Sequence, residues 1–378
     1  MDLTKEQLNL RERIIRSLEA QGFSVGQKLT GGDSKEACRN LQTKSKLDAL
    51  AYSKDFLLNS LEVAKSYCRN GFEITPENIL LELREVKTNT LENLLFRWWN
   101  IIWWSIPIQG SCGRQMKFLL WDTAHNSPFG LIHLQSPLLK LSARDKYLEI
   151  PLDELDTWVN KSMNAQRVGA LPPYNDLLGG KMVAIALTCN EIREAYRSKY
   201  KDYVSIIKRR KLEPELLFIT TTGAFGKSSL YNRLRYNGET VAEHVGYTSG
   251  FGTFHIPSEL YRELLKFLAE KGVNVERELT RIPRRNLRLL GVGLRHIRLS
   301  SLTHHGINRG VYLFPLVSNL KAVIHEKANP VWINRPFANL VDYWKERWAI
   351  PRAERKPEWR NFDAGVFFET TEKMLREL

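Results

Sequence analysis

The most distinctive chemistry in this sequence belongs to a basic segment without acidic residues. Between Leu279 and His325 the chain carries arginines and Lys321 but no Asp or Glu. Positive charge over such a length is difficult to balance with neighbouring side chains, so we expect it to meet acidic residues elsewhere or an external polyanion. If that polyanion is DNA or RNA, the expected phosphate contacts come from Arg281, Arg284, Arg285, Arg288, Arg295, Arg298 and Arg309. His304 and His305, together with Arg309, would line a polar pocket for an anion.

A second candidate site lies in the stretch from Met163 to Tyr200. An apolar extended segment, Arg167 to Leu171, leads through two prolines into a loop that ends at Gly179 and Gly180. A helix is expected to begin near Lys181. The first N–H groups of a helix have no partner within it, so they suit a phosphate or another anion. The alternative is that this strand and helix are simply the centre of the core.

The carboxylates and cysteines do not indicate a metal site. No two of the candidate aspartates have a spacing that fixes a metal pair, and the cysteines form no CxxC motif. We therefore expect no bound metal and read the cysteines as buried or incidental thiols. The residues considered are Asp122, Asp145, Asp153, Asp156, Asp176, Cys38, Cys68, Cys112 and Cys189.

The overall composition favours a basic protein of the cytoplasm. The 378 residues have a formal net charge of +14, and such an excess favours a nucleic-acid partner through long-range steering and counterion release. The alternative is a solvated basic surface with no such partner. No apolar run approaches the roughly 20 residues of a membrane-spanning helix, and the N-terminus has no signal-peptide core. We expect no membrane association.

The elements that must position these residues fall into three predicted regions. Residues 1–92 are expected to form a helical N-terminal region, which includes a short helix after Pro76. Residues 93–275 are expected to form an α/β core. Residues 276–378 are expected to form a basic C-terminal extension packed on the core, with a Pro- and Arg-rich extended tail that resembles a docking arm. The predicted regions thus place the glycine loop in the core and the arginines in the extension.

Within the core, apolar runs predict the strands of a sheet. Lys117–Trp121 and Phe129–Leu134 are joined by turn residues and predict a hairpin. Leu216–Thr221 and Val311–Val317 predict buried strands, and Ser258–Gly272 predicts an amphipathic helix.

Four tryptophans lie close together in the segment FRWWNIIWWSIPI, which begins at Phe96. Tryptophans can stack on unpaired bases. Large aromatic residues more often build a core or a subunit interface, and we favour that interpretation here.

The order of these elements predicts an α/β (α+β) fold with a mixed sheet and flanking helices. This order is similar to that of the GNAT acyltransferase superfamily. The resemblance implies an acyl-CoA cofactor whose pyrophosphate lies near Gly179 and Gly180, with Tyr231 as the acid that protonates the departing thiolate. His255 or Glu191 would then serve as the base. The alternative is that Tyr231 is an aromatic residue packed in the core.

Longer strings resemble the DruA family of the Druantia antiphage defence systems. They include GRQMKFLLWD from Gly113, PFGLIHLQSPLLKL from Pro128, LLFITTTGAFGKSSLYNRL from Leu216 and HGINRGVYLFP from His305, and the resemblance extends from Phe96 to Phe362. It implies antiviral defence in bacteria and other Druantia components as partners, including a large helicase-type protein. A related region accompanies some transposases, which implies a connection with mobile DNA.

Three hypotheses for the molecular role follow. The protein is a defence subunit that engages nucleic acid, an N-acyltransferase, or a scaffold without catalytic activity that holds other subunits. The basic segment favours the first hypothesis, the glycine loop with Tyr231 favours the second, and the tryptophans with the basic tail favour the third.

Overall fold

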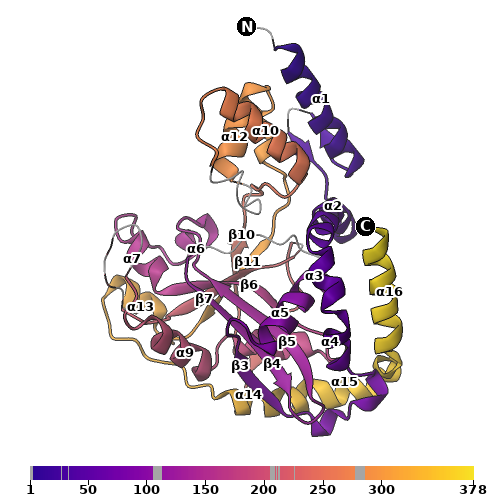
Figure 1. The fold of residues 1–378 in the computed structure, drawn as a ribbon. Coiled ribbons are helices and arrows are strands. Elements are labelled where there is room, and N and C mark those ends of the chain that lie inside the picture. The colour runs from indigo at the N-terminus through magenta and orange to yellow at the C-terminus, as the bar shows by residue number, and fades with distance from the viewer. Residues whose placement is uncertain are drawn as a thin grey trace.

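A seven-stranded sheet flanked by helices forms the centre of the molecule (Figure 1). The computed structural model describes residues 3–26, 28–32, 34–104, 113–204, 209, 211, 213–224, 226–276 and 286–378. Across the sheet, the strands are β10 (Glu243–Tyr247), β11 (Gly310–Pro315), β7 (Phe218–Thr222), β6 (Ser162–Ala170), β5 (Ser127–Gln135), β4 (Gln115–Asp122) and β3 (Leu81–Glu85). The predicted mixed α/β fold and the predicted hairpin, now β4 and β5, are confirmed.

One pair of neighbouring strands differs from the others in direction. β6 and β7 run parallel, whereas the other neighbours among the described strands of this sheet run antiparallel. The parallel pairing extends only from Ser162 opposite Phe218 to Ala165 opposite Thr221. Beyond that point β6 continues beside β5 alone, so the sheet divides in its middle.

A bulge lies next to this division. His133 on β5 lies opposite Arg167 on β6, but the following residue, Leu134, lies opposite Ala165. Gln166 is therefore an extra residue in β6. The bulge places the Arg167 side chain on the same face of the sheet as His133, because cross-strand partners share a face.

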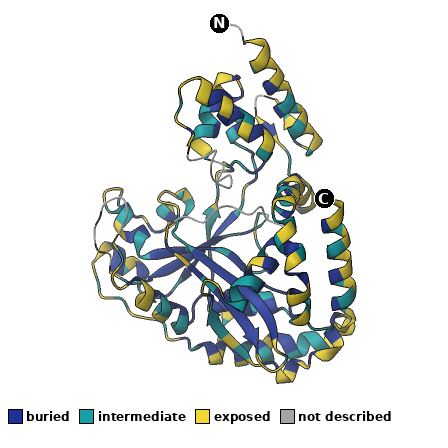
Figure 2. Cartoon of the chain, in the orientation of Figure 1, coloured by how far each residue is buried: buried dark blue, intermediate teal, exposed yellow. Residues whose placement is uncertain are grey.

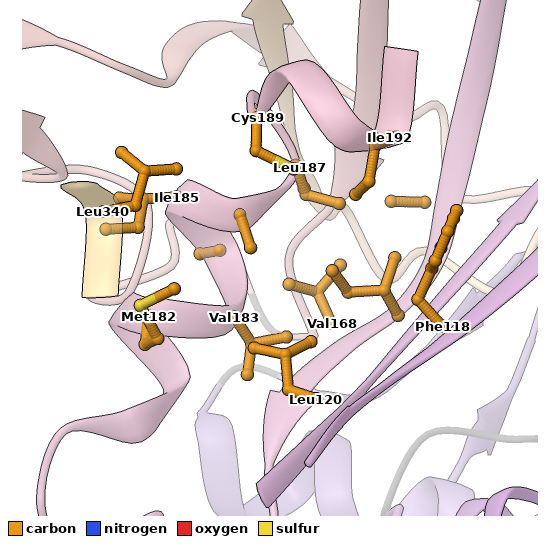
Figure 3. Packing of buried hydrophobic residues seen from close by; sticks show 14 of the residues in the cluster. Phe118, Leu120, Val168, Met182, Val183, Ile185, Leu187, Cys189, Ile192 and Leu340 are labelled. Atoms are coloured by element: carbon orange, nitrogen blue, oxygen red, sulfur yellow. The ribbon is translucent and has the colours of Figure 1, made fainter. Parts of the chain in front are cut away.

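Both faces of the sheet are covered by helices. Met163 and Val168 of β6 face one layer, where Met182 and Val183 of α8 pack against the strands and Leu340 of α14 packs behind them (Figure 3). This layer contains α8 (Gly179–Ala186), α9 (Asn190–Tyr200) and α14 (Phe337–Trp344). The opposite face is covered by α5 (Leu91–Ile102) and, toward β10, by α6 (Ser142–Tyr147), α7 (Leu155–Asn160) and α13 (Leu320–His325). Burial on both faces explains why β5 reads as a nearly continuous apolar run.

A smaller group of helices projects from the end of the sheet, and we call it the upper lobe (Figure 1). It has its own apolar core, with exposed residues around its outside (Figure 2). The lobe comprises α1 (Lys5–Ala20), β1 (Ser24–Val25), β2 (Leu29–Thr30), α10 (Ser258–Glu270), α12 (Leu287–His296) and η3 (Ser300–Thr303). The N-terminal helix and a segment from the second half of the chain thus build one core. The long helix α2 (Lys35–Tyr52) leads from this lobe to the α5 side of the sheet.

The C-terminal segment wraps around the sheet as a chain of helices. These are α14, the π-helix η4 (Lys345–Ala349), α15 (Ile350–Arg355), η5 (Pro357–Asn361) and α16 (Ala364–Glu377). The prediction of an extended tail is wrong here, because Pro351 and Pro357 lie in the first turns of α15 and η5, where proline is tolerated. α16 runs beside α3 (Lys54–Asn59) and α4 (Leu61–Ser66).

The tryptophan segment is part of the core, as favoured from the sequence. Trp98 and Trp99 are fully buried. Trp98 stacks on Phe368 of α16, with ring centroids 5.0 Å apart, and its indole Nε1 donates to the carbonyl of Leu57. These two rings are therefore not available to stack on bases.

Two local predictions are wrong. The segment after Pro76 forms the short 3-10 helix η2 (Pro76–Asn78) and then the strand β3, because Leu81 and Leu83 alternate with polar residues at the period of a strand. The helix predicted to begin near Lys181 is interrupted: α8 ends at Ala186, and Cys189 has extended backbone before α9 begins. The other short elements are η1 (Gly71–Glu73), β8 (Arg235–Tyr236) and β9 (Glu239–Thr240).

The sheet draws strands from all three predicted regions, since β3 lies within residues 1–92 and β11 within residues 276–378. Within the described part of the chain, no helix combines the length and apolarity that crossing a membrane requires.

Candidate functional site

Three of the predicted phosphate-binding arginines lie on or beside one helix of the upper lobe. Arg288 and Arg295 are exposed on α12, and Arg298 is exposed just beyond its end. Arg281, Arg284 and Arg285 lie outside the described residues. Residues seven apart on a helix share a face, so α12 presents Arg288 and Arg295 together to solvent.

Local contacts hold this face outward. The side chain of Asn286 caps α12 by accepting from the N–H groups of Arg288 and Leu289. At the other end, the guanidinium of Arg11 on α1 donates to the carbonyl oxygens of Ile297 (2.9 Å) and Arg298 (2.8 Å). Both ends of the arginine-bearing helix are thus fixed.

Close packing fixes the buried side of α12. A Cβ added to Gly293 would lie 2.4 Å from Cγ of Leu264 on α10. Only glycine lets the two helices approach so closely. Leu290 and Leu294 complete the buried side of α12, so the helix cannot rotate to turn the arginines toward the core.

The seventh arginine, Arg309, lies apart from α12. It precedes β11, and its Nη2 donates to the side-chain Oε1 of the fully buried Gln42 on α2 (3.1 Å). Its backbone is held by Thr248, whose hydroxyl accepts from the Arg309 N–H (3.0 Å). Burial lowers the pKa of Arg309. Its Nε is buried and has no hydrogen-bond partner in the part of the chain that the structure describes.

A row of basic residues crosses the sheet on the α5 side. Lys117 of β4 lies opposite His133 of β5, and His133 lies opposite Arg167 of β6. Arg167 is only 2% exposed, and its Nε donates to Oδ1 of Asn100 on α5 (2.8 Å). A protonated His133 would place a further positive charge directly opposite both Lys117 and Arg167, and like charges opposite each other destabilise a sheet. This arrangement, which we call the basic row, therefore has an electrostatic cost.

The pKa values of the basic row express that cost. The pKa of His133 falls to about 3, mainly because the ring is buried and further because Lys117 and Arg167 are positive. The pKa of Arg167 falls to about 10, again through burial and through the charge of Arg309. His133 is therefore neutral at pH 7, while Arg167 beside it remains charged.

The outer end of the basic row opens into a cleft at the edge of the sheet. The cleft has a volume of about 640 Å³ and lies among β3, β4, α5 and α9. Lys117 is half-buried in its wall, with its Nζ 5.6 Å from the centroid of the Phe96 ring. Burial lowers the pKa of Lys117, and the nearby charges of Arg97 and Lys199 lower it further.

The residues of the predicted acyl-CoA site are closely packed. Gly179 is buried, and a Cβ there would lie 2.6 Å from the carbonyl oxygen of Tyr174. The carbonyl of Leu178 accepts from the indole of Trp344, and Gly180 faces Leu230. Close packing therefore explains the glycine at position 179, whereas a Cβ on Gly180 would make only ordinary contacts.

Tyr231 lies in the same apolar layer as α8. It is 6% exposed and contacts the rings of Tyr312 and Phe314. Burial raises the pKa of its hydroxyl, and a hydrogen bond with Thr221 counteracts part of that rise. The two suggested bases are also engaged: His255 is buried with its Nε2 2.6 Å from the Leu302 carbonyl, and the Glu191 carboxylate accepts from the Phe337 N–H.

The two adjacent histidines of the basic segment differ in surroundings. His305 is buried, and its Nδ1 accepts from the Ile307 N–H (3.1 Å). Burial, with the charges of His255 and Arg309, lowers the pKa of His305 to about 3. His304 is half-buried against Phe251. In the described part of the chain, no group of three or more His, Cys, Asp or Glu side chains is arranged to hold a metal ion.

The basic row was missed from the sequence, although Arg167 was noted at the start of a central strand. Lys117, His133 and Asn100 each lie singly within apolar stretches. A polar residue inside a strand that is buried on both faces is a signal worth following, because such a residue needs a partner.

Comparison with known proteins agrees with the resemblance seen in the sequence. The model of the family described as Druantia protein DruA matches residues 32–326. The Druantia protein DruA of Escherichia coli strain UMEA 4076-1 is 29% identical over 388 aligned residues, which cover 98% of this chain and 93% of that protein. No solved structure matches the chain. Because the family match covers more than half of the chain, this protein belongs to the DruA family.

Proposed function

We propose that this protein is a Druantia antiphage defence component that engages nucleic acid through the arginine face of α12. One observation carries the proposal: Arg288 and Arg295 are exposed on the same face of a helix whose ends and buried side are fixed. In the described part of the chain neither arginine forms an ion pair. Exposed arginines held in this way can contact phosphates without first breaking another interaction.

The family resemblance adds a partner to this proposal. A helicase-type Druantia component would act on the same nucleic acid, and this protein would help to bring the two together. A pull-down after nuclease treatment tests whether the partner binds the protein itself, because contact through nucleic acid alone would be lost.

The direct test is nucleic-acid binding by the double variant Arg288→Ala and Arg295→Ala. We expect the wild-type protein to bind DNA or RNA at low salt and the variant to bind about tenfold or more weakly. The slope of log affinity against log salt should become shallower by about two, one for each lost phosphate contact. Fluorescence anisotropy over a salt series measures both quantities.

The matched control removes two charges from another side of the same lobe. Lys5→Ala with Arg16→Ala changes α1, which packs on α10 and, through Arg11, contacts the residues that end α12 (Figure 1). We expect this control to keep the wild-type affinity. Equal losses in both double variants would mean that net charge rather than the α12 face drives binding, and no wild-type binding at low salt would refute the proposal.

A second candidate function follows from the division of the sheet. A single parallel pair that separates beside a bulge, followed by a helix and by Tyr231, resembles the GNAT arrangement, and we propose a GNAT-like fold on this basis. An acyl-CoA-dependent N-acyltransferase would use Tyr231 as general acid. Calorimetry with acetyl-CoA tests binding, and absence of binding refutes this function. If the wild-type protein binds acetyl-CoA and transfers the acyl group, Tyr231→Phe should keep the binding and lose the acyl transfer in an activity assay.

A further inference from the structure

The cleft beside the basic row is lined by more positive than negative side chains among the described residues. Among the described residues, the charged groups of its wall are Lys87, Lys117, Lys199 and Glu85. Lys199 and Glu85 form an ion pair with Nζ and Oε1 2.6 Å apart. Two lysines therefore remain, and neither forms an ion pair in the described part of the chain.

Lys117 is the more unusual of these two lysines. Its ammonium is half-buried, rests on the ring of Phe96 and forms no hydrogen bond within the described residues. Behind it the basic row continues with His133 and Arg167. A partly desolvated cation among other cations costs free energy, and a bound anion would offset that cost.

The rest of the lining can hydrogen-bond a ligand. Thr88, Asn93, Gln115 and Ser198 place hydroxyl and amide groups around the lysines. The volume of about 640 Å³ lies within the range of roughly 300–1,000 Å³ for small-molecule sites. The cleft therefore suits a compact ligand rather than a nucleic-acid strand along the surface.

We propose that this cleft binds the phosphate group of a small molecule, with Lys117 and Lys87 as the phosphate contacts. Two lysines that form no ion pair with the described residues match the charge of a phosphate dianion, and lysine binds phosphate as a point charge. The neutral polar groups then hold the remainder of the ligand. The site is separate from α12, so it goes beyond the proposed nucleic-acid function.

Thermal unfolding with inorganic triphosphate tests the site, with potassium chloride at matched ionic strength as the reference. The melting temperature of the wild-type protein should rise with triphosphate concentration beyond the effect of chloride, because a ligand that binds only the folded state stabilises it. In Lys117→Met the apparent affinity should fall by about tenfold or more, which corresponds to one lost charge-assisted contact. Lys65→Met, at a half-buried lysine on α4 outside the cleft, should keep the wild-type response.

The same experiment shows whether the variant still folds. Without triphosphate, Lys117→Met should melt at the wild-type temperature or higher, because it removes a cation that Arg97 and Lys199 repel. If it fails to fold, Lys87→Met, at an exposed cleft position, takes its place with the same expected loss.

Three outcomes would overturn the proposal: no wild-type response to triphosphate, an unchanged response in both cleft variants, or an equal loss in Lys65→Met. The Arg288→Ala and Arg295→Ala variant separates this site from the nucleic-acid face. If the arginine double variant loses the triphosphate response and Lys117→Met keeps it, the anion binds at α12. If the arginine double variant loses only nucleic-acid binding, the cleft proposal stands.

Discussion

At the scale of single residues, the chemistry of a buried basic group decides whether it carries charge at pH 7. His133 and Arg167 are neighbours in the same row, yet the first is neutral at pH 7 and the second is positive. An imidazole can lose its proton when it is desolvated, whereas a guanidinium holds its proton even in a buried position. The row therefore combines a histidine that is neutral at pH 7 with an arginine that is charged.

His133 should make the protein sensitive to acid. Its pKa is about 3 in the folded protein and about 6.5 in the unfolded chain. Between these values the unfolded chain binds a proton that the folded protein does not, so the free energy of unfolding falls by about 1.4 kcal/mol for each pH unit below about 6.5. Above that pH the contribution of His133 is constant. His133→Gln should reduce the fall seen between pH 7 and pH 5 in urea unfolding.

The control for this measurement is His296→Gln at an exposed position on α12. It removes a histidine without changing the basic row and should keep the wild-type acid dependence. If His133→Gln also keeps the full dependence, then His133 does not contribute as a neutral buried group. His305, whose pKa is also about 3, should contribute a similar share through the upper lobe.

At the scale of elements, close contact between α10 and α12 positions the arginine face. Gly293→Ala should destabilise the protein by about 1–3 kcal/mol, because the new methyl group meets the side chain of Leu264. Urea unfolding followed by circular dichroism measures the loss. A shift of α12 should also weaken nucleic-acid binding without removing an arginine.

Gly291→Ala provides the comparison on the same helix. Its new Cβ would have ordinary contacts, 3.8 Å from Arg295 and Thr303, and alanine favours a helix over glycine by up to about 1 kcal/mol. We therefore expect Gly291→Ala to be neutral or stabilising. Equal destabilisation by both substitutions would contradict the packing explanation for Gly293.

At the scale of the whole molecule, the C-terminal helix closes the core over the N-terminal helices. Phe368 of α16 is fully buried and stacks on Trp98 of α5. Phe368→Ala should lower the free energy of unfolding by about 3–5 kcal/mol, since it removes a large ring from a core contact. Denaturant unfolding monitored by tryptophan fluorescence measures this loss.

Val366 is the control position on the same helix. It is 59% exposed, and Val366→Ala should change the free energy of unfolding by no more than about 0.5 kcal/mol. A small effect of Phe368→Ala would instead indicate that α16 packs only loosely on the core.

Much of the architecture was predictable from local patterns. The apolar runs of β4 and β5, the turn between them and the amphipathic α10 were correct because burial imposes a period or a continuous apolar run on the chain. β3 was wrongly predicted as a helix because a short apolar segment can fit either period. The tail was wrongly predicted as extended because its prolines were read without their positions in the first turns of helices.

The sequence by itself also determined the charge of the chain, the acid-free segment and the family to which the chain belongs. These are properties of residue order, which folding does not alter. The assignment of Arg309 to the same group as Arg288 followed the sequence alone, and the two side chains prove to lie in different parts of the molecule.

Only the tertiary structure decided which residues share a site. Lys117, His133 and Arg167 lie on three strands, and a one-residue bulge at Gln166 sets the register that aligns them. β5 and β6 are joined through α6 and α7 and not by a short turn, so the sequence does not give their register, and a slip of one residue would move every side chain of a strand to the other face. Contacts with residues distant in the sequence likewise bury Gly179 and Tyr231, which looked available in the sequence.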